Sequence, residues 1–175
     1  MQWLVNAYEA VRDFMELGGP VLGVIAANIF LMWILIFERL YFFRTGHRAN
    51  ITNALATWEA RSERKSWNAH QIREKLVSEV SLAARGSLPL IKTLVALCPL
   101  LGLLGTVTGM IEVFQVMAAT GSSNARLMAG GVSKATIPTM AGMVGALSGV
   151  FAVLYLNRKA DREAHLINDH LTMDH

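Results

Sequence analysis

The amino-acid sequence predicts an all-α membrane protein with three transmembrane helices and cytoplasmic helical extensions. Composition is the first indication: 53% of the 175 residues are hydrophobic and only 17% are charged, whereas charged residues make up about a quarter of a soluble domain. The second is the presence of three long uncharged runs, each close to the roughly 20 residues with which a helix crosses about 30 Å of hydrocarbon. We therefore expect the chain to lie in a bilayer.

The first element, residues 1–16, is expected to form an amphipathic helix on the outer membrane surface. Leu4, Tyr8, Val11 and Met15 recur at helical spacing and would share one face. The segment contains acidic residues and has no basic start, so it lacks the pattern of a cleaved signal peptide. We expect it to be retained.

The three membrane spans are predicted from uncharged sequence. A single carboxylate, Glu112, interrupts the second span, and an odd number of spans places the two chain ends on opposite sides of the membrane. The predicted spans are residues 17–38, 89–119 and 131–157, and their uncharged runs are 17–37, 93–111 and 135–156.

Basic residues predict which side each connection faces, because cytoplasmic loops carry the excess of Lys and Arg. The N-terminal segment has only Arg12, and the predicted periplasmic turn at 120–130 has only Arg126, so both are expected outside. The two cytoplasmic regions, 39–88 and 158–175, hold Arg39, Arg44, Arg48, Arg61, Arg64, Lys65, Arg73, Lys75, Arg85, Arg158, Lys159 and Arg162. Topology thus accounts for the net charge of +3, and nucleic-acid binding is not predicted.

The cytoplasmic region 39–88 is expected to be helical. Its apolar residues recur at helical spacing on either side of a charged joint, ARSERKS, which predicts two amphipathic helices. Those residues are Ile51, Leu55 and Trp58 before the joint and Ile72, Leu76, Val80 and Ala83 after it.

The tail, residues 158–175, is expected to continue the third span as a cytoplasmic helix. Its three histidines, His165, His170 and His175, raise a metal site as an alternative. A spacing of five does not put His165 and His170 on one helical face, so a solvated helix end is preferred and no metal is predicted.

Enzyme motifs are absent from the sequence. It contains no GxxxxGK[ST] loop to hold phosphates. Ser133 and Ser148 have no histidine at membrane depth that would activate them as nucleophiles. We therefore predict neither catalysis nor a cofactor.

The second and third spans contain small residues and prolines where leucine would serve. Small residues three or four apart let helix backbones approach closely in lipid. Proline has no N–H, so Pro99 and Pro138 leave the carbonyls of Val95 and Lys134 in need of a hydroxyl, a water or a neighbouring chain. Such carbonyls are typical of a hydrated cavity. The small residues concerned are Gly102, Gly105, Gly109, Ala141, Gly142, Gly145 and Gly149.

Depth in the membrane can be compared if these two spans form an antiparallel hairpin. Pairing Thr106 with Thr139 then brings Glu112 level with Lys134 to within one residue. A lone charge at mid-bilayer costs about 2.5–3.5 kcal/mol. One hypothesis is that Glu112 and Lys134 neutralise each other toward the outer end, and the alternative is that each reaches separately into water.

The segments PLLGLLGTVTGM and GGVSKATIPTMAGMVGALSGVFAVLYLNRKA resemble the second and third membrane spans of the ExbB, TolQ and MotA family of proton-driven motor subunits. The order of parts matches across nearly the whole chain, and the GLLGTV and ATIPTMAG motifs are most similar to ExbB of TonB systems. The resemblance implies a homopentamer in the bacterial inner membrane. Its second and third spans would enclose the single membrane helices of an ExbD-like partner.

The resemblance also implies roles for particular residues. Thr106 and Thr139 match the threonines that face the pore in that family, whereas Lys134 stands where ExbB and TolQ usually carry a glutamate. Threonine does not titrate near neutral pH, so it can orient water or accept a hydrogen bond but cannot store a proton. Glu112 is the only carboxylate well inside a span, about 9 Å from Thr106 along the helix, so the proton-carrying acid is expected on the ExbD-like partner.

The implied function is conversion of proton-motive force into work on a TonB-like protein for outer-membrane uptake, with membrane lipids as surroundings. A TolQ-like role in envelope integrity is the near alternative. A flagellar-type stator is disfavoured by the small cytoplasmic section. A passive scaffold would use the threonines only for packing, and an independent solute transporter is disfavoured because three spans contain no repeated pair of broken helices.

Overall fold

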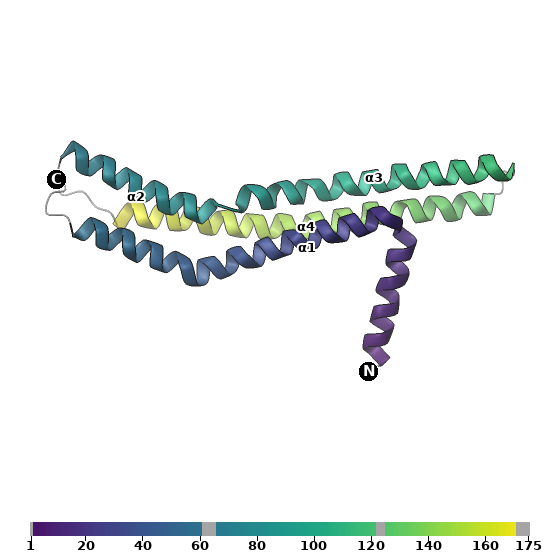
Figure 1. Cartoon of the computed structure of the whole chain (residues 1–175), viewed down its shortest axis with the longest axis horizontal. Helices are drawn as coiled ribbons and strands as arrows, with labels where there is room; N and C mark the ends of the chain where they lie inside the picture. Colours follow the sequence, from purple (N-terminus) through teal and green to yellow (C-terminus); the bar gives the residue numbers. More distant parts are fainter. Residues whose placement is uncertain (1, 61–65, 122–124, 171–175) are drawn as a thin grey trace. The chain divides into compact units, whose positions relative to one another are not determined.

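The computed structural model describes residues 2–60, 66–121 and 125–170, which form four α-helices and no strand. The helices are α1 (Gln2–Glu59), α2 (Trp67–Arg85), α3 (Leu88–Thr120) and α4 (Ala125–His170) (Figure 1). Three stretches are long and apolar enough to cross a membrane, within Gly18–Gly46, Trp67–Thr120 and Met128–Leu166. The all-helical class and the three candidate spans are thereby confirmed.

The chain divides into two compact units, and we describe each separately. The hairpin unit comprises Met1–Met32 and Thr93–Val150. The basal unit comprises Trp33–Lys92 and Phe151–His175.

Helix α1 is broken inside the hairpin unit. Gly19 has φ 65° and ψ −167°, a left-handed φ that glycine adopts without steric cost. Pro20 follows, and proline suits the first position of a new helical segment because it has no N–H to leave unpaired. The ribbon turns sharply at this point (Figure 1). Before the break, Trp3 and Tyr8 are exposed, as an unpaired surface helix would require.

Within the hairpin unit, α3 and α4 touch backbone to backbone through glycines. A Cβ added at Gly102 would lie 2.9 Å from Thr139 Cα, and one added at Gly142 would lie 2.5 Å from the Cys98 carbonyl oxygen. Real Cβ atoms do not approach other atoms so closely. The two helices can therefore pack at this distance only because these positions lack a side chain.

Four further glycines of the hairpin contact side chains. Gly105 lies against the ring of Pro138, and Gly109 against Ala135. Helix α1 packs on Gly145 and Gly149, because Ile29 lies over Gly145 and Met32 lies over Gly149. The three helices therefore interlock around positions without side chains.

A polar side chain of α1 also joins this packing. Asn28 donates from Nδ2 to the Leu94 carbonyl oxygen at 3.0 Å and lies 3.1 Å from Cys98 Sγ. Leu22 and Ile25 are fully buried on the same helix. The hydrogen bond fixes the rotation of α1 about its axis, because a buried amide needs a partner.

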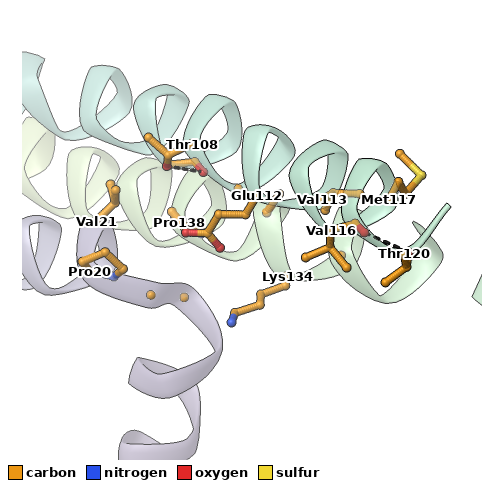
Figure 2. A pocket seen from close by; sticks show the side chains of 16 residues that line it. Pro20, Val21, Thr108, Glu112, Val113, Val116, Met117, Thr120, Lys134 and Pro138 are labelled. Atoms are coloured by element: carbon orange, nitrogen blue, oxygen red, sulfur yellow. Dashed lines mark hydrogen bonds between the residues drawn. The ribbon is translucent and has the colours of Figure 1, made fainter. Parts of the chain in front are cut away.

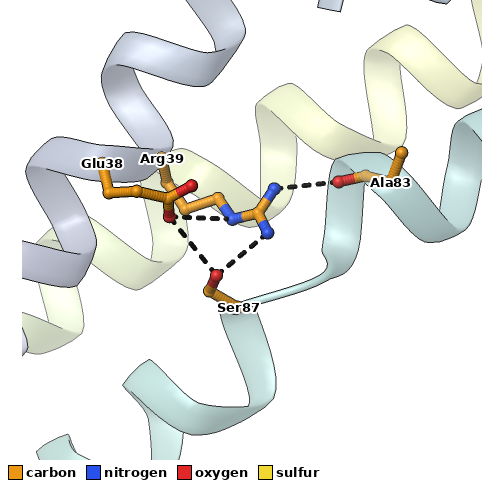
Figure 3. Close-up of polar contacts among 4 residues, drawn as sticks. All are labelled: Glu38, Arg39, Ala83 and Ser87. Atoms are coloured by element: carbon orange, nitrogen blue, oxygen red, sulfur yellow. Dashed lines mark hydrogen bonds and ion pairs between the residues drawn. The ribbon is translucent and has the colours of Figure 1, made fainter. Parts of the chain in front are cut away.

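The basal unit is organised around one buried cation, Arg39. Its Nη1 donates to the Ala83 carbonyl oxygen at 2.8 Å and its Nη2 to Ser87 Oγ at 2.9 Å (Figure 3). Ser87 in turn donates to Glu38 Oε2 at 3.3 Å, which lies 3.5 Å from Arg39 Nε. The guanidinium thus ties α1 to the short break between α2 and α3.

The predicted amphipathic helices of this unit turn apolar residues inward. Trp58 is buried against Ala69 at the start of α2, and Leu76 packs with Val80 farther along. Ser66 caps α2 by accepting a hydrogen bond from the Ala69 N–H at 3.2 Å. The charged joint at 61–65 lies outside the described residues.

Replacing the buried cation should destabilise the protein. In Arg39→Met the apolar stem is retained, but the carbonyl of Ala83 and the hydroxyl of Ser87 lose a charged donor. We expect a loss of about 2–3 kcal/mol, seen as a lower midpoint in thermal unfolding of the detergent-solubilised protein.

Arg44→Met is the matched control, because Arg44 is exposed five residues further along α1. Its midpoint should stay near that of the wild type. Equal midpoints for the two variants would contradict the structural role assigned to Arg39.

A methyl group at the helix contact should separate α3 from α4. Gly142→Ala would place a carbon 2.5 Å from the Cys98 carbonyl oxygen, and overpacking of this kind costs about 1–3 kcal/mol. Thermal unfolding in detergent measures the loss. Gly130→Ala in the same helix meets no atom within 4 Å and should be neutral or slightly stabilising, so a similar loss in both variants would rule out the contact as the cause.

Candidate functional site

The two predicted pore threonines lie on facing helices of the hairpin unit. Thr139 donates from Oγ1 across to the Gly102 carbonyl oxygen at 3.0 Å. Gly102 lies one helical turn before Thr106 on α3, so the bond holds Thr139 within about one turn of Thr106. Both are half-buried in the isolated chain.

The hydroxyl hydrogens of both threonines are occupied by backbone. Thr106 donates from Oγ1 to the Leu103 carbonyl oxygen at 2.7 Å, and Thr139 uses its hydrogen on Gly102. A hydroxyl has one hydrogen to give and two lone pairs that accept. In this arrangement each threonine oxygen can therefore act only as an acceptor toward a third group.

Thr108 is a polar residue that the sequence-based site does not include. It donates from Oγ1 to the carbonyl oxygens of Leu104 at 3.0 Å and Gly105 at 3.1 Å. It faces a cavity, not the layer of Thr139. Its place two residues after Thr106 in GTVTG, on a different helical face, was the available signal.

A cavity of about 410 Å³ lies in the hairpin unit between α1, α3 and α4 (Figure 2). Thr106 and Thr139 do not line it. Its wall on α1 is the break at Gly18–Val21. Its walls on the other two helices are formed by Gly105, Thr108, Gly109, Glu112, Val113, Val116, Met117 and Thr120 of α3 and by Gly131, Lys134, Ala135 and Pro138 of α4.

Two charged residues of the hairpin, Glu112 and Lys134, line this same cavity. Figure 2 shows Glu112 extending from α3 and Lys134 from α4, with Pro20 of α1 on the same side. Among the described residues neither side chain forms an ion pair. The pairing of Glu112 with Lys134 stays a prediction.

The contacts between helices give the register of the hairpin. Gly109 lies against Ala135, and Gly131 against Val113, so Lys134 is level with Met110. Glu112 is then offset from Lys134 by two residues, or about 3 Å along the axis, where the pairing of Thr106 with Thr139 predicts one residue.

The two prolines of the hairpin have different surroundings. Pro138 is fully buried, where its ring fills the space above Gly105. Pro99 lies on an exposed face of α3. Both remain inside continuous helices.

The three-histidine alternative has no described geometry. The side chain of His170 and all of His175 lie outside the described residues, and His165 is exposed on α4. No three potential metal-ligating side chains come together in the part of the chain that the structure describes.

Comparison with known proteins places these helices in a family. The model of the MotA/TolQ/ExbB proton channel family matches residues 39–169, about three-quarters of the chain. The matched range includes the two predicted pore threonines, Glu112 and Lys134.

Individual relatives carry related names. The chain is 46% identical over 65 residues to biopolymer transport protein exbB1 of Vibrio cholerae, covering 37% of this chain and 28% of the relative. It is 33% identical over 100 residues to biopolymer transport protein ExbB of Xanthomonas campestris, covering 53% and 40%. An ExbB-like biopolymer transport protein of Synechocystis is 37% identical over 92 residues, covering 45% and 44%.

The chain thus spans less than half the length of these curated relatives. The family model, by contrast, covers most of the chain. The chain belongs to the MotA/TolQ/ExbB proton channel family.

Proposed function

We propose that this protein is an ExbB-like subunit of a proton channel in the bacterial inner membrane. With an ExbD-like partner it converts proton-motive force into work on a TonB-like protein. The observation that carries the proposal is the bond from Thr139 to the Gly102 carbonyl, inside the segment that matches the family. It lies in a layer that has hydroxyls from two helices.

Because the two threonine oxygens can only accept hydrogen bonds, the partner has to supply a hydrogen-bond donor. With their hydrogens committed to carbonyls, Thr106 and Thr139 can receive a hydrogen bond from a protonated carboxylic acid. They offer no hydrogen to the ionised form, and hydrogen bonds to the neutral form favour that form. The hydroxyl layer would therefore hold a partner's acid in its protonated state. Loss of the proton would weaken its contact with the wall.

This chemistry supports a step coupled to proton flow. Each proton that moves down a potential of 100 mV releases about 2.3 kcal/mol. An acid that binds the threonine layer when neutral and leaves it when charged changes its contacts once per proton. The enclosed partner helices would shift accordingly.

The proposed assembly is a homopentamer around the partner helices. Helix α3 presents Leu100, Leu103 and Val107 to the outside of the single chain. Side chains of this kind need lipid or another protein surface. Neighbouring copies and the partner helices would cover one part of this surface, and lipid the rest.

The proposed topology follows the basic residues. Residues 1–16 would lie on the periplasmic surface and the turn at 120–130 would also face the periplasm, while 39–88 and 158–175 would be cytoplasmic. The break at Gly19 would mark the point where α1 enters the bilayer.

Valine in place of either threonine tests the proton path, because valine keeps the shape and removes the hydroxyl. We expect Thr106→Val and Thr139→Val to reduce proton flux by about tenfold or more. The flux is measured with a pH-sensitive dye inside vesicles that contain the complex with its ExbD-like partner. Serine at either position should retain part of the flux.

Thr45→Val is the matched control, since Thr45 donates to the Tyr41 carbonyl oxygen at 2.9 Å on an exposed face of α1. It should leave proton flux unchanged. A passive scaffold would instead keep full flux and uptake in the valine variants. Proton flux through this chain without any partner would contradict the proposal that the partner supplies the proton-carrying acid.

Complementation separates the TonB-type role from the TolQ-like one. We expect the chain, expressed with its ExbD-like partner, to restore TonB-dependent uptake in cells that lack both Exb and Tol components. Restoration of detergent resistance without uptake would favour the TolQ-like role instead.

A further inference from the structure

We propose that the cavity between the α1 break and the hairpin binds the headgroup of phosphatidylethanolamine. Glu112 would receive the ammonium group, and Lys134 the phosphate. This inference goes beyond the proposed function and does not rest on it, because the threonine layer does not line the cavity.

The charge pattern of the cavity fits a zwitterion. One carboxylate and one ammonium group line the same space (Figure 2), and neither forms an ion pair among the described residues. A headgroup with a positive amine and a negative phosphate can satisfy both charges at once. An anionic headgroup could pair with Lys134 through its phosphate. It has no amine to pair with Glu112, so its phosphate and the carboxylate would repel each other.

The depth of the cavity in the membrane agrees with a headgroup. The uncharged run from Thr93 to Ile111 is about 28 Å long as a helix, close to the thickness of the hydrocarbon core. Glu112 follows it directly and therefore lies where the hydrocarbon ends. Lys134 is about 3 Å deeper, and its long stem lets the amine reach the boundary.

Aliphatic side chains continue the cavity wall beside the two charges. Val21 of α1 and Val113, Val116 and Met117 of α3 line the same space. A soluble zwitterion has no apolar part to pack against this wall, whereas a lipid has acyl chains that can. The mixed lining therefore favours a phospholipid over a free phosphoamine.

The break in α1 keeps this space open. Gly19 adopts a positive φ, and a Cβ placed there would meet nothing within 4 Å. Because the chain turns at Gly19, the preceding helix does not continue along the hairpin and cover the charges (Figure 1). Gly109 and Gly131 leave the cavity floor without side chains.

Native mass spectrometry of the delipidated complex tests the site. Synthetic phosphatidylethanolamine, phosphatidylglycerol or free phosphoethanolamine is added back, and the bound molecules are counted per protomer. We expect phosphatidylethanolamine to bind in preference to phosphatidylglycerol by about fivefold or more. Free phosphoethanolamine should not bind at the same concentration.

Charge variants identify the residues. In Glu112→Gln the preference for phosphatidylethanolamine should disappear, and in Lys134→Gln both lipids should bind less. Lys75→Gln and Glu79→Gln are the matched controls, since they remove equal charges from an exposed pair on α2.

A variant without charge change guards against misfolding. Val116→Trp fills the aliphatic side of the cavity from an exposed position, and it should reduce lipid binding while the complex keeps its mass. Equal binding of the two lipids by the wild type would overturn the proposal, as would an unchanged preference in Glu112→Gln and Lys134→Gln. Equal binding of free phosphoethanolamine would overturn the assignment to a lipid.

Discussion

The backbone contact between α3 and α4 is the constraint on which the rest of the hairpin depends. A Cβ added at Gly142 would lie 2.5 Å from the Cys98 carbonyl oxygen. This proximity lets the short side chain of Thr139 reach the Gly102 carbonyl at 3.0 Å. In lipid, where no hydrophobic force pulls helices together, close packing and such hydrogen bonds are what remains to hold them. The same glycines therefore provide cohesion and place the hydroxyls.

Packing and chemistry are coupled by this contact. A hydroxyl that faced an open channel would rotate freely and act as donor or acceptor in turn. Thr139 is instead held by the neighbouring helix, and Thr106 by its own helix. The hydroxyl hydrogens are thus committed before a partner binds, and each oxygen is left as an acceptor. Sites that stabilise a developing charge depend on such preorganisation. A sequence with leucine at Gly102 would lose both the proximity and the fixed polarity.

Some of this structure could be predicted from the sequence because the relevant signals are local. Uncharged runs of sufficient length predict spans, and Trp58, Leu76 and Val80 recur with the period of a helix. The bonds of Arg39 could not be predicted, since they join it to residues 44 and 48 positions away. The two-residue offset between Glu112 and Lys134 could not be predicted either, because it depends on how the side chains of the two helices interlock. The cavity depends on the turn at Gly19, a backbone choice that Gly-Gly-Pro permits but does not specify.

The separation of the charged cavity from the threonine layer bears on where a transported proton can rest. Glu112 and Lys134 face a space walled by α1, whereas the Thr139 hydroxyl points between α3 and α4. Glu112 is also about 9 Å from Thr106 along α3, beyond the reach of a hydrogen bond. In the proposed pathway this carboxylate therefore does not serve the hydroxyl layer. Lys134 is a cation, so it adds no second acid on α4. In the proposed pathway the proton-carrying acid would come from another polypeptide.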